Sequence, residues 1–221
     1  MLEPRTAVIF DLDGTLLDTI DDLADSMNHV LLENALPAHP VDAYFHFIGN
    51  GMAKLVERAL PESIRSNSEQ VARFTEAFRI AYDARWNRKS KPYPGIPEVL
   101  DSLVAAGIPM AICSNKPDPF TQKCVAELLP RWKFDCVLGQ SDAFPRKPDP
   151  SSTLHITTTL GIAPAETWFI GDSGVDMQTA SAAGAKAVGV LWGFRSDSEL
   201  RENGASHIVT TPAELRELLS V

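Results

Sequence analysis

The sequence predicts an α/β protein with a doubly wound, Rossmann-like parallel sheet and an all-helical insertion after the first strand. Two observations support this fold class. Short apolar runs near residue 10 and through the second half of the chain alternate with stretches of helical periodicity, which is typical of parallel sheets covered by helices. Residues 16–89 interrupt this alternation, since they contain helical patterns and no good strand.

Five runs are predicted to be buried strands. Each is apolar throughout instead of alternating with polar residues, as expected for strands that helices cover on both faces. In chain order the predicted strands are Ala7–Phe10, Pro109–Cys113, Cys136–Leu138, Trp168–Ile170 and Ala187–Val190.

The helices of the α/β region are marked by their boundary residues. Proline near a first turn, glycine just past a last turn and threonine before a first turn are common helix boundaries. The predicted helices are Gly95–Ala106, Pro117–Leu129, Gly174–Ala183 and Pro212–Leu219.

Apolar residues at helical spacing predict four helices in the insertion. Their ranges are Asp21–Asn34, Val41–Phe47, Met52–Leu60 and Glu69–Trp86. The proline-rich segment Lys91–Gly95 is predicted to be the return linker. We therefore expect residues 1–15 and 90–221 to form the α/β core domain, and residues 16–89 to form a separate helical domain.

Composition excludes several classes of protein. The 221 residues include 20 Lys and Arg against 29 Asp and Glu, a net charge of −9, so the chain has no general attraction for nucleic-acid polymers or anionic membranes. The longest apolar run, Ala187–Phe194, is much shorter than a membrane span of roughly 20 residues, and the N-terminal apolar run is too short for a signal peptide. We expect a cytoplasmic protein with three reduced cysteines and no nucleic-acid or membrane partner.

Polar residues that could carry chemistry lie at four places, three of them directly after a predicted strand. Because the carboxyl ends of parallel strands meet at one edge of a sheet, we expect these residues to converge. In chain order they are Asp11, Asp13 and Thr15, then Ser114 and Asn115, then Lys147 between prolines, and finally Asp172, Ser173 and Asp176.

The converging residue types indicate a metal site beside a phosphate site. Carboxylates in close proximity repel and raise one another's pKa values, which a divalent cation prevents, and oxygen ligands in a small site favour Mg²⁺. A serine hydroxyl, N–H groups at a helix N-terminus and a lysine suit a phosphoryl group. Each segment alone is also compatible with ordinary caps and turns; the combination favours a site.

With these four segments the chain resembles the haloacid dehalogenase superfamily, in particular its phosphatase branch with a small helical cap. The segments occur in family order as Asp11-Leu-Asp-Gly-Thr-Leu16, Ser114, Lys147-Pro148 and Gly171-Asp-Ser-Gly-Val-Asp176. Two less specific segments, Ile48-Gly-Asn-Gly51 and Trp192-Gly-Phe-Arg195, are similar to those of phosphoglycolate phosphatases.

The resemblance implies a role for each site residue. Asp11 would be the nucleophile that forms an aspartyl-phosphate, Asp13 the general acid and base, and Lys147 the residue that balances charge. The other implied assignments are Asp11, Asp13 (through its main-chain carbonyl) and Asp172 for Mg²⁺; Ser114, Asn115 and Lys147 for the phosphoryl group; and Thr15, Ser173 and Asp176 as supporting residues.

The resemblance also implies that the insertion is a cap domain that determines specificity. Its candidate substrate contacts are Gly49, Asn50, Gly51 and Lys54. The implied substrate is a small phosphorylated metabolite, with 2-phosphoglycolate as the first candidate. Nucleotidase, sugar-phosphate phosphatase and pyrophosphatase activities remain alternatives, as do a β-phosphoglucomutase-like phosphomutase and a non-catalytic phosphate-binding regulator. Either a monomer or a homodimer is compatible with the sequence.

Overall fold

The computed structural model describes residues 6–221, which divide into two compact units. The first unit contains the described chain up to Leu17 together with Pro92–Val221, and the second contains Asp18–Lys91. Within residues 6–221, no helix combines the length and the apolar character needed to cross a membrane. The three cysteines are free thiols, as predicted.

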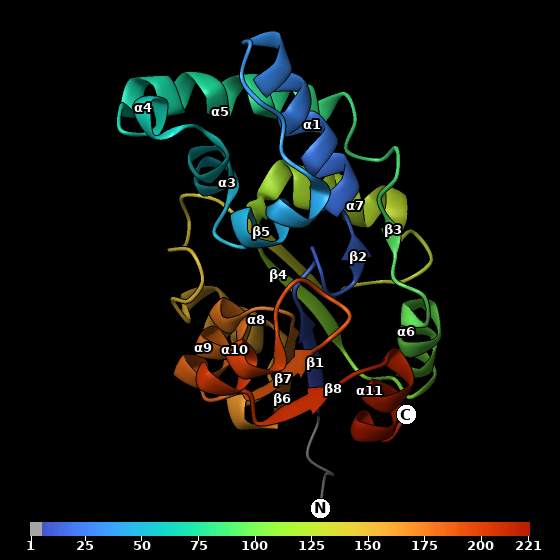
Figure 1. Ribbon diagram of the computed structural model, residues 1–221. Coiled ribbons are helices and arrows are strands. Elements are labelled where there is room, and N and C mark those ends of the chain that lie inside the picture. The colour runs from blue at the N-terminus through green and yellow to red at the C-terminus, as the bar shows by residue number, and fades with distance from the viewer. Residues whose placement is uncertain (1–5) are drawn as a thin grey trace, which may run out of the picture. The chain divides into compact units, whose positions relative to one another are not determined.

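A six-stranded parallel sheet forms the centre of the first unit, in the order β5-β4-β1-β6-β7-β8 (Figure 1). The strands are β1 (Ala7–Phe10), β4 (Met110–Pro117), β5 (Cys136–Gln140), β6 (Thr167–Gly171), β7 (Lys186–Val190) and β8 (His207–Val209). The short strand β1 lies inside the sheet and pairs with β4 on one side and β6 on the other. The predicted doubly wound fold class is confirmed.

Helices cover both faces of this sheet. They are α6 (Ile96–Ala105), α7 (Asp118–Leu128), α8 (Ser151–Leu160), α9 (Gly174–Ala183), α10 (Asp197–Glu202) and α11 (Pro212–Leu219), with a 3₁₀ turn at Pro164–Glu166. Figure 1 shows α8, α9 and α10 on one side, and α6 and α11 on the other. Ile9 and Phe169 of the sheet are fully buried. They belong to one cluster with Ile156 of α8, Met177 of α9 and Leu200 of α10. This burial explains why the strands are apolar throughout.

The ends of the sheet differ from the sequence prediction. β4 does not end at Cys113 but continues through Pro117, and α7 therefore begins at Asp118 instead of Pro117. The extension is polar but buried, so an apolar pattern could not reveal it. β8 was not predicted, because it has three residues at the edge of the sheet and begins with the exposed residue His207.

The second unit is helical. Its elements are α1 (Ile20–Glu33), a 3₁₀ turn (Val41–Ala43), α2 (Tyr44–Phe47), α3 (Met52–Ala59), α4 (Glu62–Arg65) and α5 (Ser68–Asp83). Met27 and Leu31 of α1 and Phe78 and Tyr82 of α5 are almost completely buried and belong to its core. The single predicted helix Val41–Phe47 is thus a 3₁₀ turn followed by one turn of α-helix, and α4 was not predicted.

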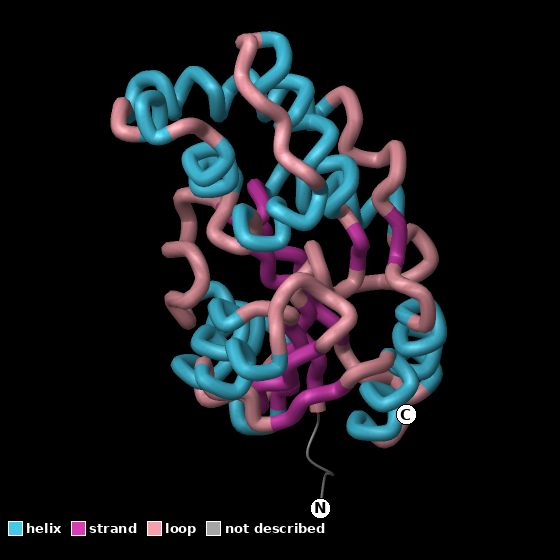
Figure 2. The backbone as a smooth tube through the Cα atoms, in the orientation of Figure 1, coloured by secondary structure: helices cyan, strands magenta, loops and turns pink. Residues whose placement is uncertain are grey.

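The expectation that residues 16–89 contain no strand is wrong at their start. Strand β2 (Leu17–Asp18) pairs with β3 (Lys91–Pro92) in a separate two-stranded sheet, where the chain leaves and re-enters the first unit (Figure 2). The predicted return linker therefore begins with a strand. Two residues are too few to produce a recognisable alternation of polar and apolar side chains.

Candidate active site

Lys147 lies at the centre of the buried polar cluster at the carboxyl ends of β1, β4 and β6. Its Nζ donates to Asp11 Oδ1 at 2.9 Å, to Asp176 Oδ1 at 2.7 Å and to the carbonyl oxygen of Cys113 at 2.7 Å. The Lys147 side chain is 4% exposed, so the three contacts replace the hydration that its ammonium group loses. Residues more than one hundred positions apart in sequence are thereby brought together, as the sequence predicts.

Asp176 is held by its own helix as well as by Lys147. It is the third residue of α9, and its Oδ2 accepts from the main-chain N–H of Ser173 at 3.1 Å and from the Ser173 hydroxyl at 2.5 Å. In return Ser173 Oγ accepts from the Asp176 N–H, which completes a capping box. Both oxygens of Asp176 therefore have protein donors, one from Ser173 and one from Lys147.

Asp172 follows β6 and is supported by two other segments. Its Oδ2 accepts from the Phe194 N–H at 2.8 Å, and its Oδ1 accepts from Thr15 Oγ1 at 3.5 Å. The Thr15 carbonyl in turn accepts from Trp192 Nε1 at 3.0 Å. The segment Trp192–Phe194, part of one of the less specific family resemblances, thus holds Asp172 and the turn that follows β1.

The carboxylates at this site lie in an unfavourable electrostatic environment. Burial raises the pKa of Asp11 to about 7, although Lys147 opposes this shift. Burial also raises the pKa of Asp172, with further contributions from the charges of Asp176 and Asp11. For Lys147, burial disfavours the charged form, but the charges of Asp11 and Asp176 outweigh this and raise its pKa above the ordinary value. One lysine therefore does not neutralise three buried carboxylates.

The cluster has the donor set that a hard divalent cation requires. Asp11, Asp172 and Asp176 offer carboxylate oxygens that lie within 4.8 Å of one another. Asp176 accepts three donors from Lys147 and Ser173. Asp172 Oδ1 has only the long 3.5 Å contact with Thr15, and Lys147 contacts only Oδ1 of Asp11, so Asp11 and Asp172 are the better suited to bind an ion. A cation there would offset the repulsion that raises the pKa values of both.

The polar extension of β4 contacts the predicted segment that contains Lys147. Asn115 uses its side-chain amide on the main chain of Lys147, accepting from its N–H at 3.0 Å and donating to its carbonyl at 3.1 Å. Ser114 is buried, and its Oγ accepts from the N–H of Lys116 at 3.2 Å. The Asn115 side chain therefore holds the main chain of Lys147, and its use as a phosphate ligand stays a prediction.

Asp13 does not share the cluster of the other three carboxylates. Its two oxygens accept from Lys116 Nζ at 3.0 and 3.1 Å. Lys116 is not among the predicted site residues, because no local pattern connects it with a residue 103 positions earlier. The available signal was a lysine directly after two predicted phosphate-site residues.

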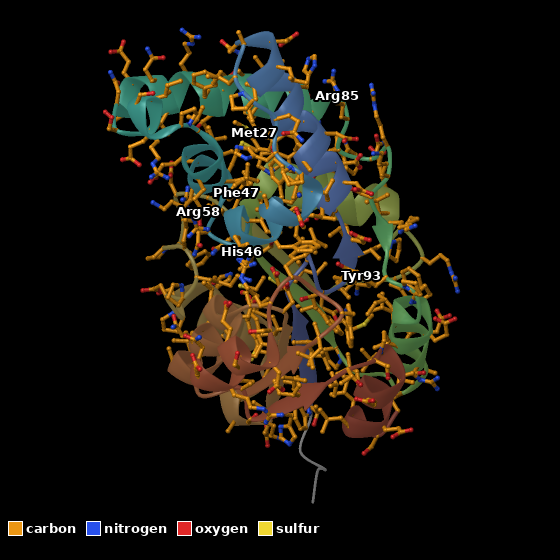
Figure 3. All side chains as sticks on the ribbon, viewed as in Figure 1. Met27, His46, Phe47, Arg58, Arg85 and Tyr93 are labelled. Atoms are coloured by element: carbon orange, nitrogen blue, oxygen red, sulfur yellow. The ribbon has the colours of Figure 1, made fainter. Side chains whose placement is uncertain are left out.

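The candidate residues of the insertion have partners within their own unit. Gly49 and Gly51 have φ values of 98° and 85°, which favour glycine, and Gly51 precedes α3. Asn50 Oδ1 accepts from Arg58 Nη2 at 2.8 Å, and Arg58 also donates to the carbonyl oxygens of His46 and Phe47 (Figure 3).

Arg58 therefore supports the turn that contains Gly49, Asn50 and Gly51. Lys54 forms an ion pair with Glu57 at 2.6 Å, and both side chains are more than one-third exposed. This exposed pair is the kind that contributes little to stability.

Comparisons with known proteins identify the family of this chain. The model of the family "Haloacid dehalogenase-like hydrolase" matches residues 8–190. A protein from Mesorhizobium japonicum named phosphoglycolate phosphatase is 35% identical over 93% of this chain and 91% of its own. A protein of the same name from Pseudomonas putida is 34% identical over 96% of this chain and 78% of its own.

Solved structures show the same fold along the whole chain. A crystal structure from Lactobacillus delbrueckii subsp. bulgaricus has 32% identity and a TM-score of 0.91, and the match covers 98% of each chain. A predicted phosphoglycolate phosphatase from Haemophilus somnus has 26% identity and a TM-score of 0.87, over 99% of this chain and all of its own. The chain therefore belongs to the haloacid dehalogenase-like hydrolase family.

Proposed function

We propose that this chain hydrolyses 2-phosphoglycolate with Mg²⁺ as cofactor, through an aspartyl-phosphate on Asp11. Family membership and the names of its relatives make the chain a phosphatase that acts on a phosphorylated small molecule. The names of those relatives supply the proposed substrate. The observation that carries the mechanism is the buried contact of Lys147 with Asp11 and Asp176, next to Asp172.

Asp11 and Asp172, with the main-chain carbonyl of Asp13, would hold Mg²⁺. The bound ion would neutralise the carboxylates and stabilise charge on the phosphoryl oxygens. Asp176 would act indirectly, since its contacts with Ser173 and Lys147 keep the Lys147 ammonium in place. Thr15 would support Asp172 in the same way.

Asp11 would act as the nucleophile. Lys147 donates to Oδ1 of Asp11, which leaves Oδ2 to attack phosphorus while the bond from phosphorus to the leaving oxygen breaks. Asp13 would give its proton to that oxygen and then take one from the water that hydrolyses the aspartyl-phosphate. Ser114, Asn115 and Lys147 would bind the phosphoryl oxygens.

The insertion, residues 16–89, would be the cap domain that determines specificity. Gly49, Asn50, Gly51 and Lys54 would recognise the part of the substrate beyond the phosphoryl group, with Arg58 supporting the turn. The net charge of −9 disfavours nucleic-acid polymers and anionic membranes as partners. We also expect the enzyme to work in the cytoplasm, as a monomer or a homodimer.

The test is hydrolysis of p-nitrophenyl phosphate and of a panel containing 2-phosphoglycolate, nucleotides, sugar phosphates and pyrophosphate. Activity should require Mg²⁺ and disappear on addition of EDTA. Asp11→Asn should reduce kcat/KM by at least about 10³-fold, because the nucleophile is lost. Asp142→Asn, in an exposed loop, is the matched control and should leave kcat/KM unchanged.

Three outcomes would contradict the proposal. Wild-type protein that hydrolyses no member of the panel with Mg²⁺ would exclude the phosphatase mechanism. A kcat/KM for a nucleotide, a sugar phosphate or pyrophosphate well above that for 2-phosphoglycolate would replace the substrate. Conversion of glucose 1-phosphate to glucose 6-phosphate would favour the phosphomutase.

A further inference from the structure

Lys116 is a buried lysine that the proposed reaction does not use. Its Nζ lies 3.0 and 3.1 Å from the two oxygens of Asp13, and its side chain is 4% exposed, against 20% for Asp13. Exposed ion pairs rarely fix a geometry, because solvent competes for both partners. Here a buried ammonium group contacts both oxygens, so it restricts the orientation of the Asp13 carboxylate.

The main chain of Lys116 is itself held in place. Strand β4 runs parallel to β1, and Phe10 pairs with Ile112. Continuing this register places the residues after Cys113 beside the turn that follows β1. The Lys116 N–H donates to Ser114 Oγ at 3.2 Å, and its carbonyl accepts from Thr121 Oγ1 at 3.1 Å.

The turn that carries Asp13 is fixed in its main chain. The N–H of Gly14, which has a φ of 90°, donates to the Leu17 carbonyl at 2.8 Å. This contact leaves the direction of the Asp13 side chain undetermined. Lys147 does not supply that direction, since its three described contacts are with Asp11, Asp176 and Cys113.

We propose that Lys116 is a positioning residue that directs the Asp13 carboxyl group toward the leaving-group oxygen. This inference rests on the proposed function, in which the O–H bond of Asp13 breaks and its proton passes to the leaving oxygen as the P–O bond breaks. With one carboxyl oxygen protonated, the other still accepts from Lys116. If the Asp13 carboxyl group is not directed toward the leaving oxygen, proton transfer becomes slower. The rate of hydrolysis should then fall most for substrates whose leaving group must be protonated.

The experiment compares Lys116→Met with wild type on leaving groups of different basicity. The kinetic constant is kcat/KM, which reports steps up to formation of the phospho-enzyme and excludes its hydrolysis. For ethyl phosphate and 2-phosphoglycolate, whose alkoxides must be protonated, kcat/KM should fall at least about tenfold. For p-nitrophenyl phosphate, which releases a stable phenolate, kcat/KM should fall less than about threefold.

Two variants serve as controls. Lys116→Arg keeps a cation that can contact both Asp13 oxygens, and it should recover a large part of the lost activity on the alkyl phosphates. Lys133→Met removes a lysine whose side chain is 87% exposed and should change no constant. Thermal unfolding of each variant shows whether the fold is intact.

An equal loss on all three substrates would mean a structural role and would overturn the inference. A loss confined to 2-phosphoglycolate would also overturn it, because Lys116 would then bind the substrate's carboxylate. Failure of the proposed function is a separate result, since wild-type protein would then be inactive on every substrate.

Discussion

Asp11 combines two properties that conflict in the absence of a cation. Its Oδ1 lies 2.9 Å from Lys147 Nζ, and this contact favours the charged form of Asp11. The side chain is also buried near two further carboxylates, and this environment favours the neutral form. The balance brings its pKa to about 7. A bound divalent ion would stabilise the charged form of Asp11. Without the ion, the proton that Asp11 binds in the folded state makes the free energy of unfolding depend on pH.

The pKa of Asp11 predicts the direction of that linkage in metal-free protein. An unfolded Asp has a pKa of about 3.9, so between about pH 4 and pH 7 the folded chain holds a proton that the unfolded chain has released. The contribution of Asp11 to the free energy of unfolding is therefore intact at acidic pH. It decreases by up to about 1.4 kcal/mol per pH unit as the pH rises toward 7.

Urea unfolding in EDTA tests this prediction, with Asp11→Asn as the variant that lacks the carboxyl group. The free energy of unfolding of the variant, minus that of wild type, should rise with pH and level off above the folded pKa of about 7. A difference that does not change with pH would contradict the prediction.

The pairing of Lys116 with Asp13 shows why sequence predicts a site only in part. Asp11 and Asp172 could be identified because each follows an apolar strand, a pattern that is visible locally. Lys116 acts through the register between β1 and β4, in which Phe10 lies beside Ile112. Register is a property of two distant segments, and one sequence gives no information about it.

At the scale of elements, the loop after β7 supports the candidate metal site through a close approach at Gly193. A Cβ at this position would lie 2.3 Å from the Asp172 Cβ and 2.4 Å from the Gly14 carbonyl oxygen. Real Cβ atoms do not come so close to other atoms, so a side chain would displace either Asp172 or the turn after β1. Position 193 therefore requires glycine, because there is no room for a Cβ atom between Asp172 and Gly14.

Gly193→Ala should therefore lower the affinity for Mg²⁺ and kcat/KM by more than about tenfold, since misplaced ligands bind the ion poorly. Mg²⁺ titration of the phosphatase activity measures both effects. Gly184→Ala is the matched control, because Gly184 has a φ of 77° and a Cβ added to it would meet no atom within 4 Å. The control should cost about 1 kcal/mol of stability and leave Mg²⁺ affinity unchanged. Equal effects of both substitutions on Mg²⁺ affinity would contradict this role of Gly193.

The elements that the sequence predicted are those with many buried residues. The apolar strands were found because burial on both faces requires apolar residues at every position. β8 was missed because an edge strand of three residues has little buried surface. The polar end of β4 was missed because its buried residues satisfy their polar groups through hydrogen bonds with one another and with Lys147, which hydropathy does not detect.

At the scale of the molecule, the chain passes between the two units twice, and Asp22 ties the ends of the insertion together. This carboxylate is 1% exposed. It accepts from the N–H of Lys89 at 2.9 Å, the N–H of Ser90 at 2.8 Å and the Ser90 hydroxyl at 2.7 Å. It lies in the first turn of α1, and its contacts hold the return segment.

Asp22→Ala should lower the free energy of unfolding by about 3 kcal/mol, because two main-chain N–H groups lose their partner. Denaturant unfolding measures this cost. Asp25→Ala is the control: Asp25 pairs with Lys89 at 2.7 Å, but both side chains are about half exposed. Such a pair should contribute at most about 1 kcal/mol. A loss for Asp22→Ala no larger than for the control would contradict the proposed tie.

The strand order of the central sheet also limits the order in which the sheet can assemble during translation. β1 is synthesised first, but its neighbours β4 and β6 begin at Met110 and Thr167. During translation Asp18–Lys91 is complete and can fold as a unit before either neighbour has left the ribosome. β1, with the nucleophile at its end, must wait for the chain through β6. A nascent chain interrupted between these points would carry the complete insertion but no assembled reaction centre.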